Sequence, residues 1–290
     1  MRGLGKKIAG HLLGLVATVL IGGFLSAALV RLAPGFEADE RELDPHLNAQ
    51  SLQELHDSRR QDENIFRFYL HYLSQAARGD LGKSLALGQP VLTLLHDRVP
   101  LTMRLMAVGL SLSWALTLTF ALSAAWLRLS IYDTATTVLS GIFLCLPAAV
   151  LALLSVLWNV PGSLAIALIV FPGTHRYTRN LLLKAYAQPH ILCARAKGLS
   201  EAHILFWHVI PVVAPQLFAI AGVSVSMAIG ASIPVEALCG FAGIGQLAWQ
   251  AAMARDLPLL VNITVLVTLV TLLANSSADV IGSVIRGPEA

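Results

Sequence analysis

The sequence predicts an all-α membrane protein with six transmembrane helices and an external helical insertion between the first two. Of its 290 residues, 56% are hydrophobic and only 13% are charged, whereas soluble domains carry about 25% charged residues. The charges cluster, and the stretches between them are long enough to supply the roughly 20 apolar residues that a membrane-spanning helix needs. So few charges could not cover a water-soluble surface of this size, but a surface facing lipid needs none.

Each of the six predicted spans is an apolar segment bounded by charged or turn-forming residues. The first contains no charge between Lys7 and Arg31. A cleaved signal peptide is the alternative there, but the apolar stretch is longer than the hydrophobic region of such a peptide. The third and fourth spans are separated by Asn-Val-Pro-Gly at residues 159–162, a composition typical of a turn. The predicted spans are residues 7–31, 105–127, 134–158, 163–178, 212–234 and 257–279.

Residues 33–99 form a polar, charged region that interrupts the apolar pattern. We expect one extramembrane subdomain here, with helices over residues 50–55 and 65–77. The chain therefore divides into residues 1–32 with the first span, this subdomain, and a five-helix core over residues 100–290. The second helix of the subdomain has an apolar face, because large apolar side chains recur at helical spacing: Phe66, Tyr69, Leu70 and Leu73.

The positions of lysine and arginine in the short loops predict the orientation in the membrane. With six spans, the basic residues of the short loops and of both ends fall on one side, which is therefore the cytoplasmic side. Five or seven spans would place the two termini on opposite sides and break this agreement. The basic residues concerned are Arg2, Lys6, Lys7, Arg128, Arg176, Arg179, Lys184, Arg195, Lys197 and Arg286.

The sequence predicts no catalytic, cofactor or metal site. Gly-Lys-Ser at residues 82–84 resembles the end of a phosphate-binding loop, but Ala77 stands where that motif needs a glycine. The histidines form no HExxH or HxH pair, and Cys145, Cys193 and Cys239 are far apart without metal-ligand spacing. A net charge of +3 without a basic stripe argues against nucleic acid as a partner. Any ATP chemistry must therefore come from another chain.

The polar segment at about residues 185–210, between the fourth and fifth spans, is the most informative part of the sequence. Gly198 can adopt a positive φ and end one helix. Ser200 can cap the next helix, with Glu201 placed favourably near its N-terminus. Pro211 kinks or ends that second helix just before the fifth span. The result is a basic cytoplasmic hairpin that either docks into another protein or lies among lipid headgroups.

This hairpin resembles the cytoplasmic coupling loop of ABC importer permeases, in which a proline follows a glycine by about thirteen residues, as Pro211 follows Gly198. Ala-Arg-Ala-Lys-Gly-Leu-Ser-Glu at residues 194–201 is similar to the sequence in dipeptide/oligopeptide-type permeases of the B-type subunit. There are four departures: the missing acidic residue at 192–194, Leu-Cys-Ala; Ala242 in place of a common proline; a very short external loop between spans three and four; and residues 57–64 without the usual Gly-Leu-rich sequence. Further resemblances follow in the same order over nearly the whole chain, at residues 31–35, 78–84, 88–91, 176–179, 235–236, 243–245 and 254–258.

The resemblance implies a type I ABC importer permease fold in a multi-pass subunit of a bacterial inner membrane, with both termini in the cytoplasm. It implies a second permease, two cytoplasmic ATPases and an external solute-binding protein as partners, lipid around the chain and no cofactor within it. Alternating access would move short peptides, with nickel complexes, glutathione or oligosaccharides as other substrates of the same family. The residues expected to couple to the ATPases are Arg195, Ala196, Lys197, Gly198, Leu199, Ser200, Glu201 and Pro211.

A candidate gate lies near the outer ends of the last two spans. Charged residues near span ends are usually solvated, so solvation is the default expectation for Asp133, Glu236, Asp256 and Asp279 unless they line a gate or pathway. Glycine lets backbones pack closely, which makes residues 240–245 a candidate external gate element. The candidate gate or pathway residues, including two serines that could instead contact neighbouring helices, are Ser224, Ser226, Glu236, Gly240, Gly243, Gly245, Arg255 and Asp256.

Two other functions stay open on the sequence. A secondary transporter that works alone predicts inverted repeats and charged residues deep inside spans, and neither is clear here. An inactive permease relative acting as a membrane scaffold is the second alternative, and the altered coupling motif and short loop between spans three and four leave it open. Co-purified ATPases together with ATP-dependent uptake would distinguish the importer from both.

Overall fold

The structure, a computed structural model, describes residues 14, 17–18, 20–25, 28, 65–76, 78–127 and 130–286. The predicted first span lies largely outside these residues, as do the helix over residues 50–55 and the basic residues at the N-terminus. The contacts divide the chain into two compact units. One consists of Met1–Arg98 with Leu247–Leu269, and the other of Val99–Gln246 with Val270–Ala290.

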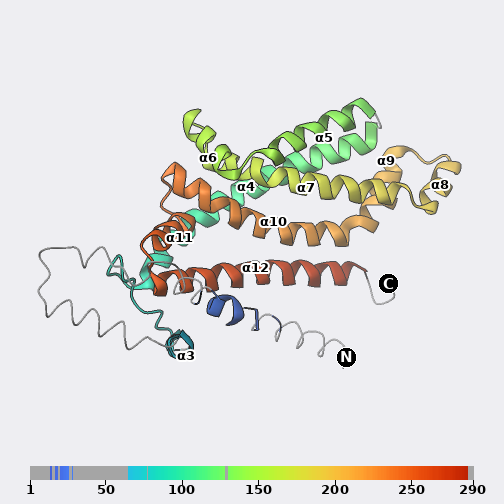
Figure 1. Ribbon diagram of the computed structural model, residues 1–290. Helices are drawn as coiled ribbons and strands as arrows, with labels where there is room; N and C mark the ends of the chain where they lie inside the picture. Colours follow the sequence, from blue (N-terminus) through green and yellow to red (C-terminus); the bar gives the residue numbers. More distant parts are fainter. Residues whose placement is uncertain are drawn as a thin grey trace, which may run out of the picture. The chain divides into compact units, whose positions relative to one another are not determined.

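The described residues fold into helices, with one isolated bridge between Lys83 and Pro90. The predicted all-α class is therefore confirmed for this part of the chain, and the helix expected over residues 65–77 is present as α3. The elements, labelled in Figure 1 where there is room, are α3 (Ile65–Ala76), α4 (Val91–Leu127), α5 (Ser130–Cys145), α6 (Ala148–Leu157), α7 (Gly162–Tyr186), α8 (Pro189–Ala196), α9 (Glu201–Ile204), the π-helical turn η2 (Leu205–Val209), α10 (Ile210–Cys239), α11 (Ile244–Met253) and α12 (Leu257–Arg286).

The third span is not one continuous helix, so the prediction over residues 134–158 is wrong in this respect. The segment forms α5 and α6, which are bent by 94° at the break between them. Pro147 is the N-cap of α6 with extended backbone angles, φ −58° and ψ 141°. Proline lacks an N–H and disfavours helical geometry in the preceding residue, which explains the break. The turn predicted at residues 159–162 is confirmed, and Asn159 there has a φ of 51°.

Among the described residues, α4, the run Glu201–Cys239 and α12 are long and apolar enough to cross a membrane, and the bent α5–α6 pair is a fourth if it is one span. The helix α7 is absent from this group because its second half is polar, with His175, Arg176 and Arg179 close together. It contacts α5, α6 and α10 (Figure 1), and most of its first half is buried. A helix surrounded by protein needs less apolar surface than one surrounded by lipid.

The core of the unit that contains α7 is built from small and branched apolar side chains of four helices. Ile166 and Val170 of α7 are fully buried. Their cluster includes Met106 of α4, Ala152 of α6 and Val235 of α10. The helices α4, α6 and α10 therefore pack against α7 and share one apolar core with it.

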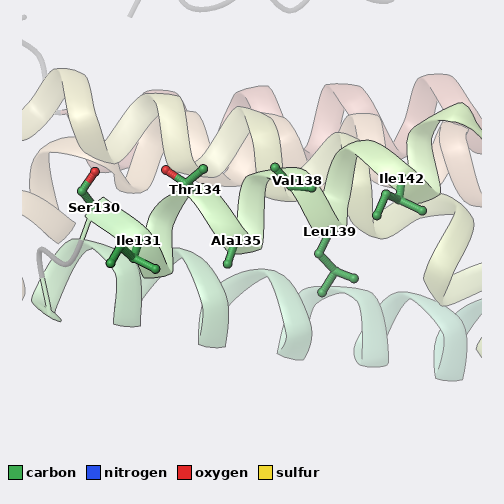
Figure 2. Close-up of a pocket in the computed structure, with 7 residues that line it drawn as sticks. All are labelled: Ser130, Ile131, Thr134, Ala135, Val138, Leu139 and Ile142. Carbon is green, nitrogen blue, oxygen red and sulfur yellow. The ribbon is translucent and has the colours of Figure 1, made fainter.

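One face of α5 is apolar and exposed, in contrast to this core. Its side chains line a shallow groove of about 610 Å³ along the helix (Figure 2). Ile131 and Ile142 on this face are exposed. An exposed apolar face of this kind is typical of contact with lipid or with another apolar surface. The residues that line the groove are Ser130, Ile131, Thr134, Ala135, Val138, Leu139 and Ile142.

Candidate functional site

The predicted hairpin between the fourth and fifth spans is formed by α8 and α9, at one end of α7 and α10 (Figure 1). Gly198 has a φ of 76° and follows α8, and its N–H donates to the Arg195 carbonyl at 2.8 Å. Ser200 is the N-cap of α9, and its hydroxyl accepts a hydrogen bond from the His203 N–H at 3.3 Å. The glycine stop and the serine cap are therefore confirmed as local structure.

The inner side of the hairpin is buried against the ends of the long helices. Its apolar side chains form one cluster with α7 and α10, which includes Leu182 and Val213. Burial of the full set fixes the hairpin to the helices that continue into the membrane. The hairpin residues in this cluster are Ile191, Ala194, Ile204, Leu205 and Val209.

The two arms of the hairpin are also joined by a polar contact. The Nε of Arg195 donates to Oε1 of Glu201 at 3.1 Å, across the glycine turn. The Arg195 guanidinium lies 5.9 Å from the centre of the Tyr186 ring, a cation–π contact. Burial raises the pKa of Tyr186 to about 12, and the nearby Glu201 carboxylate adds to this. Tyr186 is therefore neutral at physiological pH, and its ring supports Arg195.

The outer side of the hairpin presents large apolar side chains to solvent. Leu192, Phe206 and Trp207 are 67%, 55% and 72% exposed. The Trp207 ring stacks on His203 with 6.1 Å between centroids, which limits its rotation. Exposed aromatic side chains held in one orientation are typical of the residues that dominate protein–protein binding.

The hairpin continues into α10 without an interruption of the helix. The N–H of Ile210 bonds to the carbonyl of Leu205, five residues earlier, which closes the π-helical turn η2. Pro211 follows directly and has no N–H to donate. The sequence allowed the helix to end at Pro211, but the wider turn accommodates the proline and the helix runs on to Cys239.

The opposite end of α10 carries the glycine-rich stretch, residues 240–245, here called the gate loop. Gly240 caps α10 in the left-handed conformation with a φ of 71°. Oε2 of Glu236, in the last turn of α10, accepts the N–H of Gly245 at 2.6 Å. The Thr102 hydroxyl of α4 accepts the N–H of Ile244 at 2.8 Å. The loop is thus hydrogen-bonded to two different helices.

Two glycines allow this close approach. A Cβ at Gly243 would overlap the Glu236 carboxylate and lie 2.5 Å from the Thr102 hydroxyl. A Cβ at Gly245 would lie 2.7 Å from the Cα of Ile233, in the backbone of α10. The expectation that glycine permits close backbone packing here is confirmed, and the role of this loop in gating stays a prediction.

The expected solvation of the acidic residues is wrong for Glu236 and Asp256, which are 0% and 1% exposed. They belong to different units of the chain. Asp133 is half-buried and forms a two-point ion pair with Arg179 of α7, whose Nε lies 2.6 Å from Oδ1. Arg255 is exposed and has a φ of 53°. Of the predicted gate residues, the structure gathers only Glu236 and the three loop glycines into one site.

Asp256 binds the serine of the Gly-Lys-Ser stretch at residues 82–84. Its Oδ2 accepts the Ser84 hydroxyl at 2.5 Å and the Ala86 N–H at 3.0 Å. Its Oδ1 accepts the N–H of Leu259 at 3.1 Å and so caps α12. The Ser84 hydroxyl is therefore engaged by a carboxylate.

The two serines of α10 differ in their surroundings. The Ser224 hydroxyl accepts the indole N–H of Trp114 in α4 at 3.0 Å and donates to the Ala221 carbonyl at 2.7 Å. It is a helix-contact serine, the alternative that the sequence left open. The Ser226 hydroxyl has no hydrogen-bond partner among the residues that the structure describes. Its place in a pathway stays a prediction.

Sequence reasoning missed Thr102 and Trp114. Thr102 lies 142 positions before the Ile244 amide that it binds, and Trp114 lies 110 positions before Ser224. No local pattern could link these pairs. Within the described residues, no three His, Cys, Asp or Glu side chains lie close enough to hold a metal ion.

Residues 117–286, more than half of the chain, match the family "Binding-protein-dependent transport system inner membrane component". The oligopeptide transport system permease protein AppB of Bacillus subtilis (strain 168) is 26% identical over 297 residues, which cover 92% of this chain and 94% of AppB. The probable peptide ABC transporter permease protein y4tP of Sinorhizobium fredii is 25% identical over 304 residues, which cover 95% of this chain and 96% of y4tP.

The fold is similar to solved structures of the MetNI methionine ABC transporter in inward facing conformations. One of them matches with a TM-score of 0.60 and 18% sequence identity, and the match covers 67% of this chain and 97% of the other. A second crystal form gives a TM-score of 0.59. At this identity the likeness concerns the fold alone.

Proposed function

Because the chain belongs to the family of binding-protein-dependent transport system inner membrane components, and is a permease subunit of an ABC importer, we propose that its hairpin at residues 185–210 is the docking site for a cytoplasmic ATPase. One observation carries this proposal. The hairpin is fixed to the helix ends by a buried inner side, presents Leu192, Phe206 and Trp207 outward, and continues directly into α10. A hairpin fixed in this way moves together with α10, so a push on the hairpin is transmitted to that helix.

The proposed complex contains this chain, a second permease, two ATPases and an external solute-binding protein. The names of AppB and y4tP refer to oligopeptide and peptide transport, which supports short peptides as the substrate. Nickel complexes, glutathione and oligosaccharides are the other substrates to test. The chain contributes half of the translocation pathway and no ATP chemistry of its own.

The proposed topology has six spans in a bacterial inner membrane, with both termini in the cytoplasm. The span predicted over residues 7–31 precedes α4, the α5–α6 pair, α7, α10 and α12. We include α7 because neighbouring helices cover its first half. Residues 33–99, with α3, form the external insertion, and residues 100–290 form the five-helix core. The exposed apolar face of α5 supports a position facing lipid.

The proposed mechanism is alternating access, with α10 as the connecting element. The helix has 30 residues and is about 45 Å long at 1.5 Å per residue. The hairpin lies at its first end and the gate loop at its second. When the ATPases close on ATP, they push the hairpin, and α10 carries the displacement to the gate loop. The Arg195–Glu201 contact keeps the hairpin from folding at Gly198.

The deciding experiment compares Gly198→Trp with Gly198→Ala. No atom lies within 4 Å of a Cβ built at Gly198, so alanine meets no obstacle. Both variants place a side chain at positive φ, which costs about 1–2 kcal/mol. Only tryptophan adds bulk to the docking surface. We expect both variants to insert into the membrane, but only Gly198→Trp to lose ATPase binding and uptake in reconstituted vesicles.

Normal uptake by the Gly198→Trp variant would contradict the docking assignment. The same purification separates the two alternative functions. Uptake by the wild-type chain without bound ATPases would indicate a secondary transporter. Bound partners without ATP-dependent uptake would indicate a membrane scaffold.

A further inference from the structure

Glu236 is a buried carboxylate at the junction of α10 and the gate loop. It is 0% exposed. Its Oε2 accepts the N–H of Gly245 at 2.6 Å and, more weakly, the N–H of Gln246 at 3.4 Å. These amides belong to the first turn of α11, where N–H groups have no partner within the helix and the helix dipole favours a negative charge. The carboxylate therefore holds the start of α11 against α10.

The neighbouring amide is held by a different helix. The Thr102 hydroxyl of α4 accepts the N–H of Ile244. Three successive amides, at residues 244–246, are thus bound by two side chains from α4 and α10. Gly243 fits between the two acceptors only because it has no Cβ. The position of the loop depends on these two side chains together.

The Glu236 site is incompletely satisfied in this arrangement. Among the described residues, Oε1 of Glu236 has no hydrogen-bond partner although it is buried. Nearly all buried polar atoms in proteins are paired, and a cap with only a structural role would be expected to pair both oxygens. The unpaired oxygen partly offsets the stabilisation from the bonds to Oε2. Displacement of the loop would expose the carboxylate to water and remove this cost.

We propose that Glu236 is a positioning residue that holds the gate loop closed through the amides at residues 245–246, and that the loop opens in the transport cycle when these bonds are released. The inference rests on the proposed function, because it assigns the gate of that pathway. In this role the Glu236 carboxylate acts on the loop and does not contact the substrate. The α10 helix connects this latch to the hairpin at the other end of the helix.

The test measures the opening of the loop directly. Ile244 is buried in the closed loop, so an Ile244→Cys variant, which keeps the backbone N–H, reports opening by its accessibility to a maleimide once Cys145, Cys193 and Cys239 are replaced by alanine. The full transport complex is labelled in lipid nanodiscs without ATP. We expect Glu236→Ala to raise the labelling rate about tenfold, since the loss of one hydrogen bond shifts a closed–open equilibrium by up to roughly that factor. Transport per ATP hydrolysed should fall, with ATPase binding unchanged.

Glu236→Gln is the conservative control, because its amide oxygen still accepts the N–H of Gly245. We expect Glu236→Gln to restore slow labelling. Labelling of Glu236→Gln as fast as Glu236→Ala, or of Glu236→Ala as slow as wild type, would overturn the latch. ATPase binding is read in the same samples, so a failure of the hairpin assignment is distinguishable from a failure of the latch.

A second pair of variants covers the case in which Glu236→Ala does not fold. Thr102→Val keeps the shape of the side chain and removes the acceptor for the Ile244 amide, whereas Thr102→Ser keeps the hydroxyl. We expect faster labelling in Thr102→Val and wild-type labelling in Thr102→Ser. Equal labelling in the two would show that these hydrogen bonds do not hold the loop.

Discussion

Asp256 is a buried carboxylate that holds two separate segments of the chain by hydrogen bonds. It accepts hydrogen bonds from the Ser84 hydroxyl and from the N–H groups of Ala86 and Leu259. We predict that Asp256→Ala lowers the free energy of unfolding by about 3 kcal/mol, because three hydrogen-bond donors lose their acceptor at about 1 kcal/mol each. Ser84→Ala removes one of the three bonds and should cost about 1 kcal/mol. Thermal unfolding of the detergent-solubilised chain measures both, and equal unfolding temperatures would contradict the prediction.

At the same scale, the predictable residues are those whose conformation depends on near neighbours. The positive φ of Gly198 and the cap at Ser200 follow from a glycine and a serine placed between two short helices. The burial of Glu236 and Asp256 could not be predicted in this way. Their environment comes from Gly243 and from Ser84, the latter 172 positions away. Sequence patterns describe helix ends well and contacts between distant segments poorly.

At the scale of single helices, the π-helical turn before α10 sets the angle at which the hairpin faces its partner. Pro211 cannot donate to a carbonyl four residues earlier. We predict that Pro211→Ala restores a regular α-turn in place of η2 and rotates the hairpin by about 100°, one residue of an α-helix, against the packing of its buried side. Transport per ATP hydrolysed should fall, as measured in reconstituted vesicles. Val212→Ala, an exposed neighbour, is the control and should have no effect.

The number of successive apolar residues predicts the position of some helices well and their ends and bends poorly. The apolar segments over residues 105–127 and 257–279 lie within α4 and α12, but both helices are longer than their apolar parts. The 94° bend between α5 and α6 was not predicted. Pro147 is a signal for it, but a proline alone does not decide the matter, because Pro172 lies inside the continuous helix α7. The burial of α7 explains how a helix with Arg176 and Arg179 can still lie in the core.

At the scale of the whole molecule, the orientation in the membrane is the property to test. Cys193 in α8 and Lys83 are exposed, and the proposed topology places them on opposite sides. We predict that an impermeant maleimide labels Cys193 only in inverted membrane vesicles and the Lys83→Cys variant only from outside intact cells. The other cysteines are replaced by alanine in both cases. Labelling of both positions from the same side would contradict six spans.

The bond between Ser84 and Asp256 has a consequence for how the chain is made. The two residues are 172 positions apart, so at about 5–20 residues per second the ribosome adds Asp256 roughly 9–34 s after Ser84. During this interval the Ser84 hydroxyl and the Ala86 amide depend on water. The loop around them can therefore reach its final form only after Asp256, the residue directly before α12, has been synthesised.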